Sequence, residues 1–578
     1  MRKGALVVVN PVTAGATPEV TTRPQTAAVR PAPTWLAWAV PTVVTAALGL
    51  YQINVPILWR DELATWSAAS RTLPQLWAMV HNVDAVLGLY YLGLHLWTAA
   101  FGDSAAAMRL PSALAMTGAS AVVALTGKRL GGTRVGLISG LIFAVVPSVS
   151  RYAQEARPYA FATLFAALAT LLLLRAMERP TWPRWGCYTL ALAAAGASNL
   201  VALCVLAAHA AIVATDFSLR TVRIGDEDAP GGGRALPGGR PEPVEGRPLT
   251  LLGWFSLAAI VGVVLDAPVV IEGHAQSVSQ IGRQPVPHVA ALLGVIDGLW
   301  PELFASTPVA VAVILLALAS VLTLAGARQR VLAGYALAGG ILPIVAVWLI
   351  SQGPDSYWTF RYLLFTVPAW SVAAGLGVAV TAERVPRLRW PRLRLPRFAP
   401  AWRPGYAAVA TALVVVVAAL GGHDQLAIRK PLAHNLWAFP VTMANGEPVD
   451  YRAAAAVIAA NQRPGDGIVY QVDDQNHYEV DAAVGYYLRG RPIPKAVFQA
   501  ETPAQAGALQ PVECANPSTC LAGNPRIWLV YVDRLARNAS NPFTAIPGNE
   551  ESSLESRGYL SQTLYQEDGI TVALLTVR

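Results

Sequence analysis

Charged residues are scarce in this 578-residue chain. Asp, Glu, Lys and Arg make up 13% of it, against about 25% in an ordinary soluble domain, while 54% of the residues are hydrophobic. This composition excludes a typical soluble domain and predicts a polytopic membrane protein, whose length says little about domain number. The net charge is +8. In a membrane protein, the positions of Lys and Arg relative to the spans indicate the orientation in the membrane. The positive charge therefore does not predict a nucleic-acid partner, and none is expected.

Several other signals are missing. The N-terminus has no cleavable signal-peptide pattern, and residues 1–34 are expected to form a disordered cytosolic tail. No His or Cys spacing resembles a metal site, and His274 and His288 lie too far apart in sequence to suggest one, so no metal or cofactor is expected. No internal repeat is evident, which argues against a transporter built from repeats.

Eleven apolar runs are predicted to span the membrane, because crossing a bilayer takes about 20 mostly apolar residues. A further run, 87–101, is shorter and contains His95. If it also spanned, the later basic loops would fall outside the cell, so we expect it to be an amphipathic helix on the outer interface. The eleven predicted spans are residues 35–53, 109–127, 134–150, 158–176, 184–199, 200–216, 249–267, 306–326, 331–350, 361–380 and 404–421.

Basic residues predict the orientation of these spans. Most of the Lys and Arg residues fall on one side, in segments such as "GKRLGGTR" (127–134) and "ERVPRLRWPRLRLPR" (383–397). The positive-inside rule places that side in the cytosol, together with a flexible Gly- and Pro-rich linker at 217–248. The first external loop, 54–108, and everything after about residue 421 are then expected outside the cytosol.

The chain changes character after residue 421. Short β-type runs such as "RIWLVYVD" alternate with helical patterns such as "DYRAAAAVIAANQ", which predicts an extracytoplasmic α/β domain over residues 422–578. This region has no phosphate-binding glycine motif, so we expect it to stabilise the protein or to dock an acceptor. Cys514 and Cys520 lie in "ECANPSTC", and an oxidising location favours a disulfide between them.

The stretch "LWRDELATW", residues 58–66, follows the first apolar run and contains the adjacent acids Asp61 and Glu62. A charge at the bilayer centre costs roughly 2.5–3.5 kcal/mol on insertion scales, but far less at the interface, so position alone does not make these acids functional. Neighbouring residues of a helix point in different directions, so the two acids are expected to have separate roles. Arg60 is left open between a phosphate contact and an interfacial anchor.

Two more external segments contain polar clusters. "SRYAQEARPYA" (150–160) places charges of both signs and an amide between two apolar runs, which an ordinary interfacial loop rarely needs; a salt-bridge cluster at helix ends is the alternative. Arg361 begins a span at the external face, where its planar guanidinium suits a phosphate. Acids and arginines on one membrane face suit a reaction on a lipid-linked anion. A carboxylate would deprotonate an acceptor hydroxyl, and an arginine would stabilise the phosphate leaving group.

Residues 35–180 resemble the membrane glycosyltransferases of the GT-C superfamily, near family 39, which includes protein O-mannosyltransferases and aminoarabinose transferases. The resemblance rests on the order of "LWRDELATW", "LYYLGLHLWTAAFGDSAAAMRLPSALA" and "GKRLGGTRVGLISGLIFAVVPSVSRYAQEARPYAF", with "FRYLLFTVPAW" further along. The Ala-, Arg- and Gly-rich composition is typical of actinobacterial proteins. The C-terminal region has no resemblance that we can name.

The resemblance implies a polytopic α-helical GT-C fold and an inverting enzyme that needs no cofactor. Its donor would be a polyprenyl-phosphate sugar in the bilayer, and its acceptor an extracytoplasmic glycan, glycolipid or protein. Asp61 is the implied general base, Glu62 matches the second acid of the pair, and Arg361 matches an arginine near the lipid phosphate. The element that lines the donor or acceptor site is matched by Gln154, Glu155, Arg157 and Tyr159.

One departure from the family concerns the acceptor. Related sequences often have a His-Pro-Pro element before "LYY", where this chain has "HNVDAVLGLYY". Either Asp84 takes over the polar role of that element, or the acceptor differs. Two other classes of protein stay open: a lipid-linked sugar transporter or flippase, and a non-catalytic cell-envelope assembly protein. The charges gather at span ends on one face rather than within spans, which favours the glycosyltransferase.

Overall fold

The computed structural model describes most of residues 33–577. The predicted N-terminal tail, residues 1–34, lies outside the described residues except for 33–34. The predicted linker, residues 217–248, is described only at its two ends, where residues 217–227 belong to a helix instead of a linker and Pro248 begins the next helix. The other segments that are not described are 281–284, 295–297, 323–326, 386–404, 436–447, 472–478, 522, 534–535 and 537–540.

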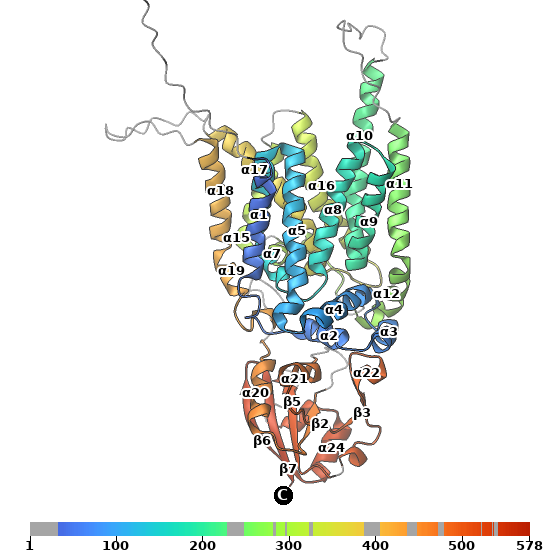
Figure 1. Ribbon diagram of the computed structural model, residues 1–578, viewed down its shortest axis with the longest axis vertical. Coiled ribbons are helices and arrows are strands. Elements are labelled where there is room, and N and C mark those ends of the chain that lie inside the picture. Colours follow the sequence, from blue (N-terminus) through green and yellow to red (C-terminus); the bar gives the residue numbers. More distant parts are fainter. Residues whose placement is uncertain are drawn as a thin grey trace, which may run out of the picture.

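A bundle of long apolar helices forms one end of the molecule, and a unit of strands and helices forms the other (Figure 1). Within the described residues, five helical segments are each long and apolar enough to cross a membrane, or seven if each of two bent pairs is one span. The five segments coincide wholly or in large part with α5 (Ala105–Gly131), α8 (Tyr159–Glu178), α10 (Val205–Glu227), α16 (Ala327–Ile350) and α17 (Val367–Arg384). Four further helices of the bundle are α1 (Leu36–Leu50), α9 (Trp182–Ser198), α15 (Thr307–Leu322) and α18 (Tyr406–Leu420).

Two of the predicted spans are bent instead of straight. α6 (Thr133–Val145) stops just before Pro147, which opens α7 (Pro147–Ala153) at an angle of 65°. Proline has no N–H for the preceding helix but suits the first turn of a new one. α11 (Pro248–Leu265) turns by 54° into α12 (Ala267–Gln280), which follows the predicted span 249–267. Both bends lie toward the end of the bundle that faces the strands (Figure 1).

Short helices cover that end of the bundle. The chain from α1 forms α2 (Arg60–Ala69), α3 (Leu73–Asn82) and α4 (Gly88–Phe101) before it enters α5. α4 lies across the bundle end rather than along the bundle (Figure 1). It buries Tyr91 and Leu94 and exposes apolar side chains, including Leu96. Such a helix suits a membrane interface.

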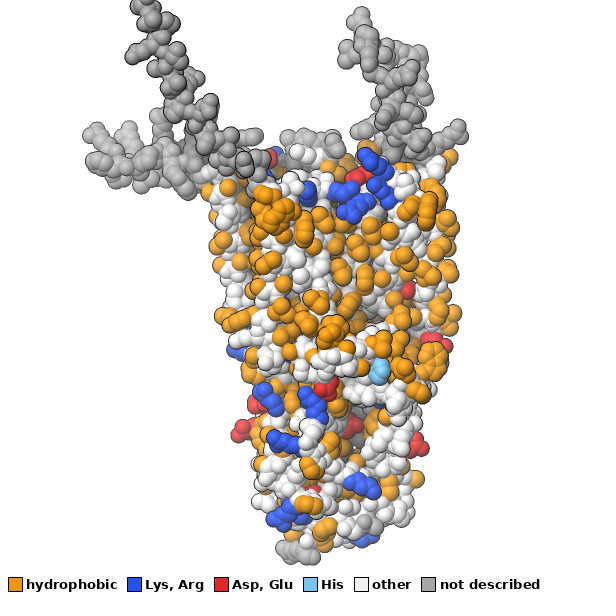
Figure 2. Space-filling model, in the orientation of Figure 1, with side chains coloured by type: hydrophobic (Ala, Val, Ile, Leu, Met, Phe, Trp, Pro, Cys, Tyr) orange, Lys and Arg blue, Asp and Glu red, His pale blue; other side chains and the backbone are white. Residues whose placement is uncertain are grey.

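The surface of the bundle is divided into zones. Hydrophobic side chains dominate its middle, and basic side chains gather at the end remote from the strands (Figure 2). α5 ends there with Lys128 and Arg129, and the last turn of α8 contains Arg175. This distribution is typical of a membrane protein with a positively charged cytosolic rim.

The C-terminal region forms a five-stranded mixed sheet in the order β2-β1-β5-β7-β6. The central strand β5 (Arg526–Val532) pairs parallel with β1 (Gly467–Tyr470) and antiparallel with β7 (Ile570–Val577). Its side chains are buried on both faces of the sheet, which explains its continuous apolar run. The remaining strands are β2 (Lys495–Ala496) and β6 (Tyr559–Glu567) in this sheet, and β3 (Gln499–Glu501) and β4 (Val512–Glu513) in a separate hairpin.

Helices α20 (Tyr451–Asn461) and α21 (Val480–Leu488) lie on the side of the sheet nearest the bundle (Figure 1). The other helices of this region are α22 (Pro503–Ala506), which contacts α3 of the first loop, α23 (Pro517–Cys520) and α24 (Gly548–Ser556). A disulfide joins Cys514, which follows β4, to Cys520 at the end of α23. The other two cysteines, Cys187 and Cys204, are free.

The sheet region is docked on the short helices of the first loop. One hydrophobic cluster contains Leu58 and Leu63 from the loop together with residues of α20, α21 and the sheet. The ring of Trp66 meets that of Tyr486 edge-on at 5.4 Å, and the Leu58 N–H donates to the Tyr487 hydroxyl at 2.9 Å. α21 is therefore fixed against α2, at the level where the polar segments of the sequence converge.

Candidate active site

Asp61 lies in the first turn of α2, where the helix dipole favours an acid. Three arginines from separate elements surround its carboxylate. Arg60 Nε lies 3.2 Å from Oδ1, while Arg157 Nη2 and Arg361 Nη2 lie 3.9 and 4.0 Å from Oδ2. The structure thus brings together three segments that stand far apart in the sequence, and it places Arg60 beside the acid.

The charges around Asp61 decide its protonation. Burial raises the pKa of its carboxyl, but Arg157, Arg361 and Arg60 together outweigh burial and hold the pKa below its usual range. The carboxyl is therefore ionised at neutral pH. Its side chain keeps 12% of its surface exposed, so a ligand can reach it.

Glu62 points the opposite way and is fully buried. Its two carboxylate oxygens accept hydrogen bonds from Arg109 Nε and Nη2 at 2.8 and 2.6 Å, and Oε1 also accepts from the Ala156 N–H at 2.9 Å. Arg109 also donates to the carbonyls of Ile53, Pro56 and Ile57. This arrangement ties the first loop to α5 and to the turn before α8. Glu62 therefore acts as a positioning residue, because both of its carboxylate oxygens are occupied and the side chain is not accessible to a ligand.

The "QEARPY" segment divides its residues between two tasks. Gln154 donates to the carbonyls of Gly49 and Tyr51 at the end of α1, at 3.1 and 2.7 Å. Glu155 is buried and pairs with Arg151, four residues earlier. Burial raises the pKa of Glu155, and the charges of Glu62 and Asp61 raise it further against the pull of Arg151. These two residues hold the turn, although the sequence had suggested that they line a binding site.

Arg157 and Tyr159 face the site instead. Arg157 Nη1 lies 3.4 Å from the hydroxyls of Thr65 and Tyr91, and its Nε has no hydrogen-bond partner among the described residues. The ring of Tyr159 lies 6.0 Å from that of Tyr362, the neighbour of Arg361. The segment therefore contributes one cation and one aromatic ring to the surroundings of Asp61.

Arg361 belongs to η3 (Phe360–Thr366), the 3₁₀ turn that leads into α17. Its guanidinium lies 5.9 Å from the ring of Trp59 and 5.8 Å from that of Tyr362, which restrict its orientation. Within the described chain its Nε is also buried without a hydrogen-bond partner. Two guanidinium groups near Asp61, each with an unused donor, form a site suited to an anion.

Asp84 stands at a left-handed backbone position, φ 59°, just before the 3₁₀ turn η1 (Ala85–Leu87). Aspartate tolerates this region better than most residues. Its Oδ2 accepts a hydrogen bond from Tyr91 Oη at 2.7 Å, and Tyr91 in turn lies beside Arg157. Asp84 is thus linked to the Asp61 cluster through one tyrosine.

A cavity of about 470 Å³ opens beside this chain of contacts. Arg157 and Asp84 supply its charged groups, and α12 contributes His274 and Ser277. Aromatic and apolar residues form most of the remaining wall: Val86, Leu87, Pro158, Tyr159, Leu200, Val201, Leu203, Val270, Ile350, Tyr357 and Tyr362. A mostly apolar wall with a few charged groups is typical of a ligand site.

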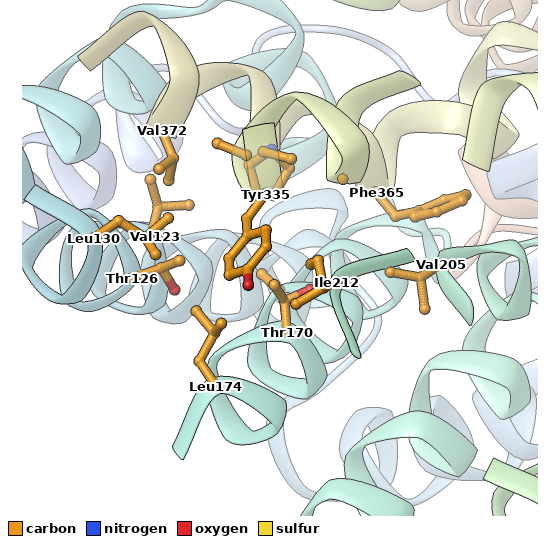
Figure 3. Close-up of a pocket in the computed structure, with 15 residues that line it drawn as sticks. Val123, Thr126, Leu130, Thr170, Leu174, Val205, Ile212, Tyr335, Phe365 and Val372 are labelled. Atoms are coloured by element: carbon orange, nitrogen blue, oxygen red, sulfur yellow. The ribbon is translucent and has the colours of Figure 1, made fainter. Parts of the chain in front are cut away.

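A second pocket lies among the membrane helices (Figure 3). It measures about 40 Å³, and its wall is mostly apolar apart from Thr126, Thr170 and Tyr335. A water needs on the order of 10–15 Å³ of such space, so this pocket holds a few waters and no sugar. The larger cavity near Asp61 is the better candidate site. Within the described chain, no group of three or more His, Cys, Asp or Glu side chains could hold a metal ion.

The sequence reasoning missed Arg109 and Arg151. Arg109 stands alone in the apolar run "AAAMRLPSALA", and an unpaired arginine in such a run is itself a signal of a buried partner. Arg151 was visible in the polar segment, but its ion pair with Glu155 depends on the helical turn of α7. Neither side chain is exposed in the site. Arg109 holds Glu62, and Arg151 holds Glu155.

Comparisons with known proteins bear on the fold. Residues 88–223 match the family model described as dolichyl-phosphate-mannose-protein mannosyltransferase. The structure of ArnT from Cupriavidus metallidurans bound to undecaprenyl phosphate is similar, with a TM-score of 0.53 and 13% identity, over 93% of this chain and 98% of that one. Its apo form gives a TM-score of 0.52 at 13% identity, over 93% and 97% of the two chains.

A more distant likeness, with a TM-score of 0.43 and 11% identity, is to the oligosaccharyltransferase AglB from Archaeoglobus fulgidus, over 93% of this chain and 74% of that one. No curated protein matches the sequence. The likeness to ArnT confirms the expected fold: the protein has the helical membrane architecture of the GT-C glycosyltransferases, with a C-terminal sheet region.

Proposed function

We propose that this protein is an inverting glycosyltransferase that uses a polyprenyl-phosphate sugar as its donor. The observation that supports it best is the placement of Asp61, an ionised acid flanked by Arg157 and Arg361 beside a cavity of about 470 Å³. A transferase of this kind needs a base for the acceptor and cations for the phosphate, close together but on different sides of the sugar.

In the proposed reaction, the acceptor hydroxyl oxygen attacks the anomeric carbon of the donor sugar. Asp61 takes the hydroxyl proton while the bond between the anomeric carbon and the phosphate oxygen breaks. The electron pair of that bond leaves with the polyprenyl phosphate, whose charge Arg157 and Arg361 stabilise. Phosphate is a good leaving group, so the reaction needs no general acid, and attack opposite to it inverts the anomeric centre.

The orientation is also a proposal. Basic residues gather at the end of the bundle remote from Asp61 (Figure 2), and the positive-inside rule would place that end in the cytosol. The site and the sheet region would then be extracytoplasmic, where a disulfide between Cys514 and Cys520 is stable. The acceptor would be a glycan, glycolipid or protein on that side.

The role of Asp61 can be tested with Asp61→Asn in purified protein. Removing a general base lowers turnover by about 10²- to 10⁴-fold. Transfer of labelled sugar from polyprenyl-phosphate mannose should therefore almost vanish, while binding of polyprenyl phosphate, followed by tryptophan fluorescence, should persist. Asp103→Asn is the matched control, because Asp103 lies on the same loop but is 41% exposed. Full transfer by the Asp61 variant would refute the proposal, and donor uptake without transfer would favour a transporter.

A further inference from the structure

A third cavity, of about 630 Å³, lies between the interfacial helix α4 and the membrane helices α5, α8 and α9. The mechanism above does not use it, and we call it the α4 cavity. Apolar side chains such as Leu94, Phe161 and Phe165 form most of its wall, and none of the described residues that line it is charged. Its ligand is therefore neither an ion nor a strongly polar group.

The wall of the α4 cavity offers a ligand few hydrogen bonds. Its polar side chains are Tyr90, Trp97 and Ser198. Trp97 Nε1 already donates to the carbonyl of Ala107 at 2.9 Å. Ser198 Oγ already donates to the carbonyl of Ala194 at 2.7 Å. A peptide chain in this cavity would leave its own N–H and C=O groups unpaired at a cost in free energy, whereas a hydrocarbon chain loses nothing.

The rim of the α4 cavity is apolar and exposed. Leu89 on α4 and Leu114 on α5 both line the cavity, and they are 58% and 55% exposed. α4 lies across the end of the bundle (Figure 1), near the level where the hydrophobic zone of the surface ends (Figure 2). Apolar side chains exposed at that level contact the hydrocarbon of a bilayer. A lipid chain can therefore enter the cavity sideways without crossing water.

The inner end of the α4 cavity reaches the candidate active site. Pro158 and Ser198 line both this cavity and the cavity of about 470 Å³ beside Arg157, so the two adjoin. The hydroxyl of Tyr91, on α4, lies 3.4 Å from Arg157 Nη1. Arg157 Nη2 in turn lies 3.9 Å from the carboxylate of Asp61. A lipid with its chain in the α4 cavity would thus bring its head toward the base.

The charges of the two cavities divide them between two lipids. The donor phosphate needs cations, and Arg157 lines the cavity of about 470 Å³ but not the α4 cavity. The mostly apolar wall of that first cavity also suits the start of a polyprenyl chain. Inversion requires the acceptor to attack from the side opposite to the phosphate. The adjoining α4 cavity, which has no cation in its described wall, suits the chain of a second lipid.

We propose that the α4 cavity binds the hydrocarbon chain of the acceptor, which is therefore a membrane lipid with a free hydroxyl group in its head. The inference rests on the proposed glycosyl transfer and narrows the acceptor from a glycan, glycolipid or protein to a lipid. The chain packs between α4 and α8, and Asp61 takes the proton of the head hydroxyl. Large voids are rare in packed proteins because their walls lose van der Waals contacts, and a bound chain restores these contacts.

Two substitutions narrow the α4 cavity from different helices. Gly93 lines it on α4, and a Cβ at Gly93 would have no other atom within 4 Å, so Gly93→Leu places its side chain in open space. Ala197→Leu narrows the cavity from α9 and is an independent second variant. Gly253→Leu on α11 is the matched control, because Gly253 also has open space around it and lines neither cavity.

The assay uses the full-length protein in lipid nanodiscs, with polyprenyl-phosphate mannose as donor. The two acceptors, hexadecyl α-mannoside and methyl α-mannoside, have the same head and differ in the chain. The wild type should prefer the hexadecyl acceptor. In Gly93→Leu and Ala197→Leu its KM should rise about tenfold or more, because overlap with an inserted side chain costs on that order. Transfer to methyl α-mannoside and the affinity for polyprenyl phosphate should stay unchanged, and Gly253→Leu should behave as the wild type.

Each of the other outcomes overturns the inference. Weaker binding of polyprenyl phosphate with an unchanged KM for hexadecyl α-mannoside would assign the cavity to the donor chain. Unchanged values in both variants would mean that the cavity holds bulk lipid. Earlier thermal unfolding with equal losses for the donor and both acceptors would show a structural role. The transfer proposal survives all three results, since the wild type still transfers sugar. If the wild type binds the donor but transfers sugar to neither acceptor, both proposals fall.

Discussion

The Glu62→Gln substitution distinguishes an acid that holds the fold from one that takes part in the reaction. The side chains of Glu62 and Arg109 are both 0% exposed, and Arg109 Nη2 lies 2.6 Å from Glu62 Oε2. Glutamine keeps the size of Glu62 but removes its charge. Arg109 would then have no counter-charge, and one of its N–H groups would face the new amide NH2 instead of an oxygen. The carbonyls of Ile53, Pro56 and Ile57 would remain as partners, but they are uncharged.

Breaking one partner of a buried ion pair costs about 3–5 kcal/mol, because the remaining charge stays uncompensated. The stability loss of Glu62→Gln should fall in this range. The weakened pair also loosens the tie between the first loop, α5 and the turn before α8, so Arg157 loses its fixed place near Asp61. Turnover should therefore fall together with stability.

Chemical unfolding in detergent micelles measures the effect, and Glu178→Gln is the matched control. Glu178 pairs with Arg129 at 2.7 Å, but the two side chains are 53% and 30% exposed. A surface pair contributes about 0–1 kcal/mol, so the control should unfold close to the wild type. The double variant Glu62→Leu with Arg109→Met removes both charges and should recover part of the lost stability.

Two results would contradict this reasoning. Wild-type stability in Glu62→Gln would show that Arg109 is compensated by other groups. Normal stability with abolished turnover would show that Glu62 acts directly in the reaction. In that case the double variant would stay inactive however stable it became.

Three further predictions follow from the site and the sheet region. In the wild type, kcat/KM should fall only as the pH drops through the depressed pKa of Asp61, and Arg60→Gln should move this acid limb to higher pH, because one stabilising cation is lost. Replacing Cys514 and Cys520 by Ser should cost about 2 kcal/mol of stability in the sheet region, since the bridge closes a short loop, and reductant should destabilise only the wild type. A reporter fused after residue 103 should give an extracytoplasmic signal, and a cytosolic signal would mean that residues 87–101 span the membrane.

The sequence predicts the helices of this fold well, because apolar runs of span length need no tertiary information. It does not predict the break between α6 and α7, although Pro147 stands at the bend. Proline inside an apolar run permits either a kinked span or two helices. Packing of α7 against α5, α1 and α14 decides between them.

The site was only partly predictable for a related reason. The pattern "LWRDELATW" located Asp61 and Glu62. It did not show that Glu62 pairs with the distant Arg109, whereas Asp61 lies near Arg361. Likewise, "QEARPY" gave four polar residues without saying which two would face the site.

The arrangement of Asp61 and its arginines links donor binding to base strength. In the free protein, Arg157 and Arg361 depress the pKa of Asp61, which keeps it ionised but makes it a weak base. In the proposed reaction the donor phosphate takes up the charges of the same two arginines, so their hold on Asp61 weakens and its pKa rises. The carboxylate becomes a better proton acceptor only when a donor sugar is in place. The base is therefore strongest when the sugar can be passed to an acceptor hydroxyl, and it stays weak in the empty site.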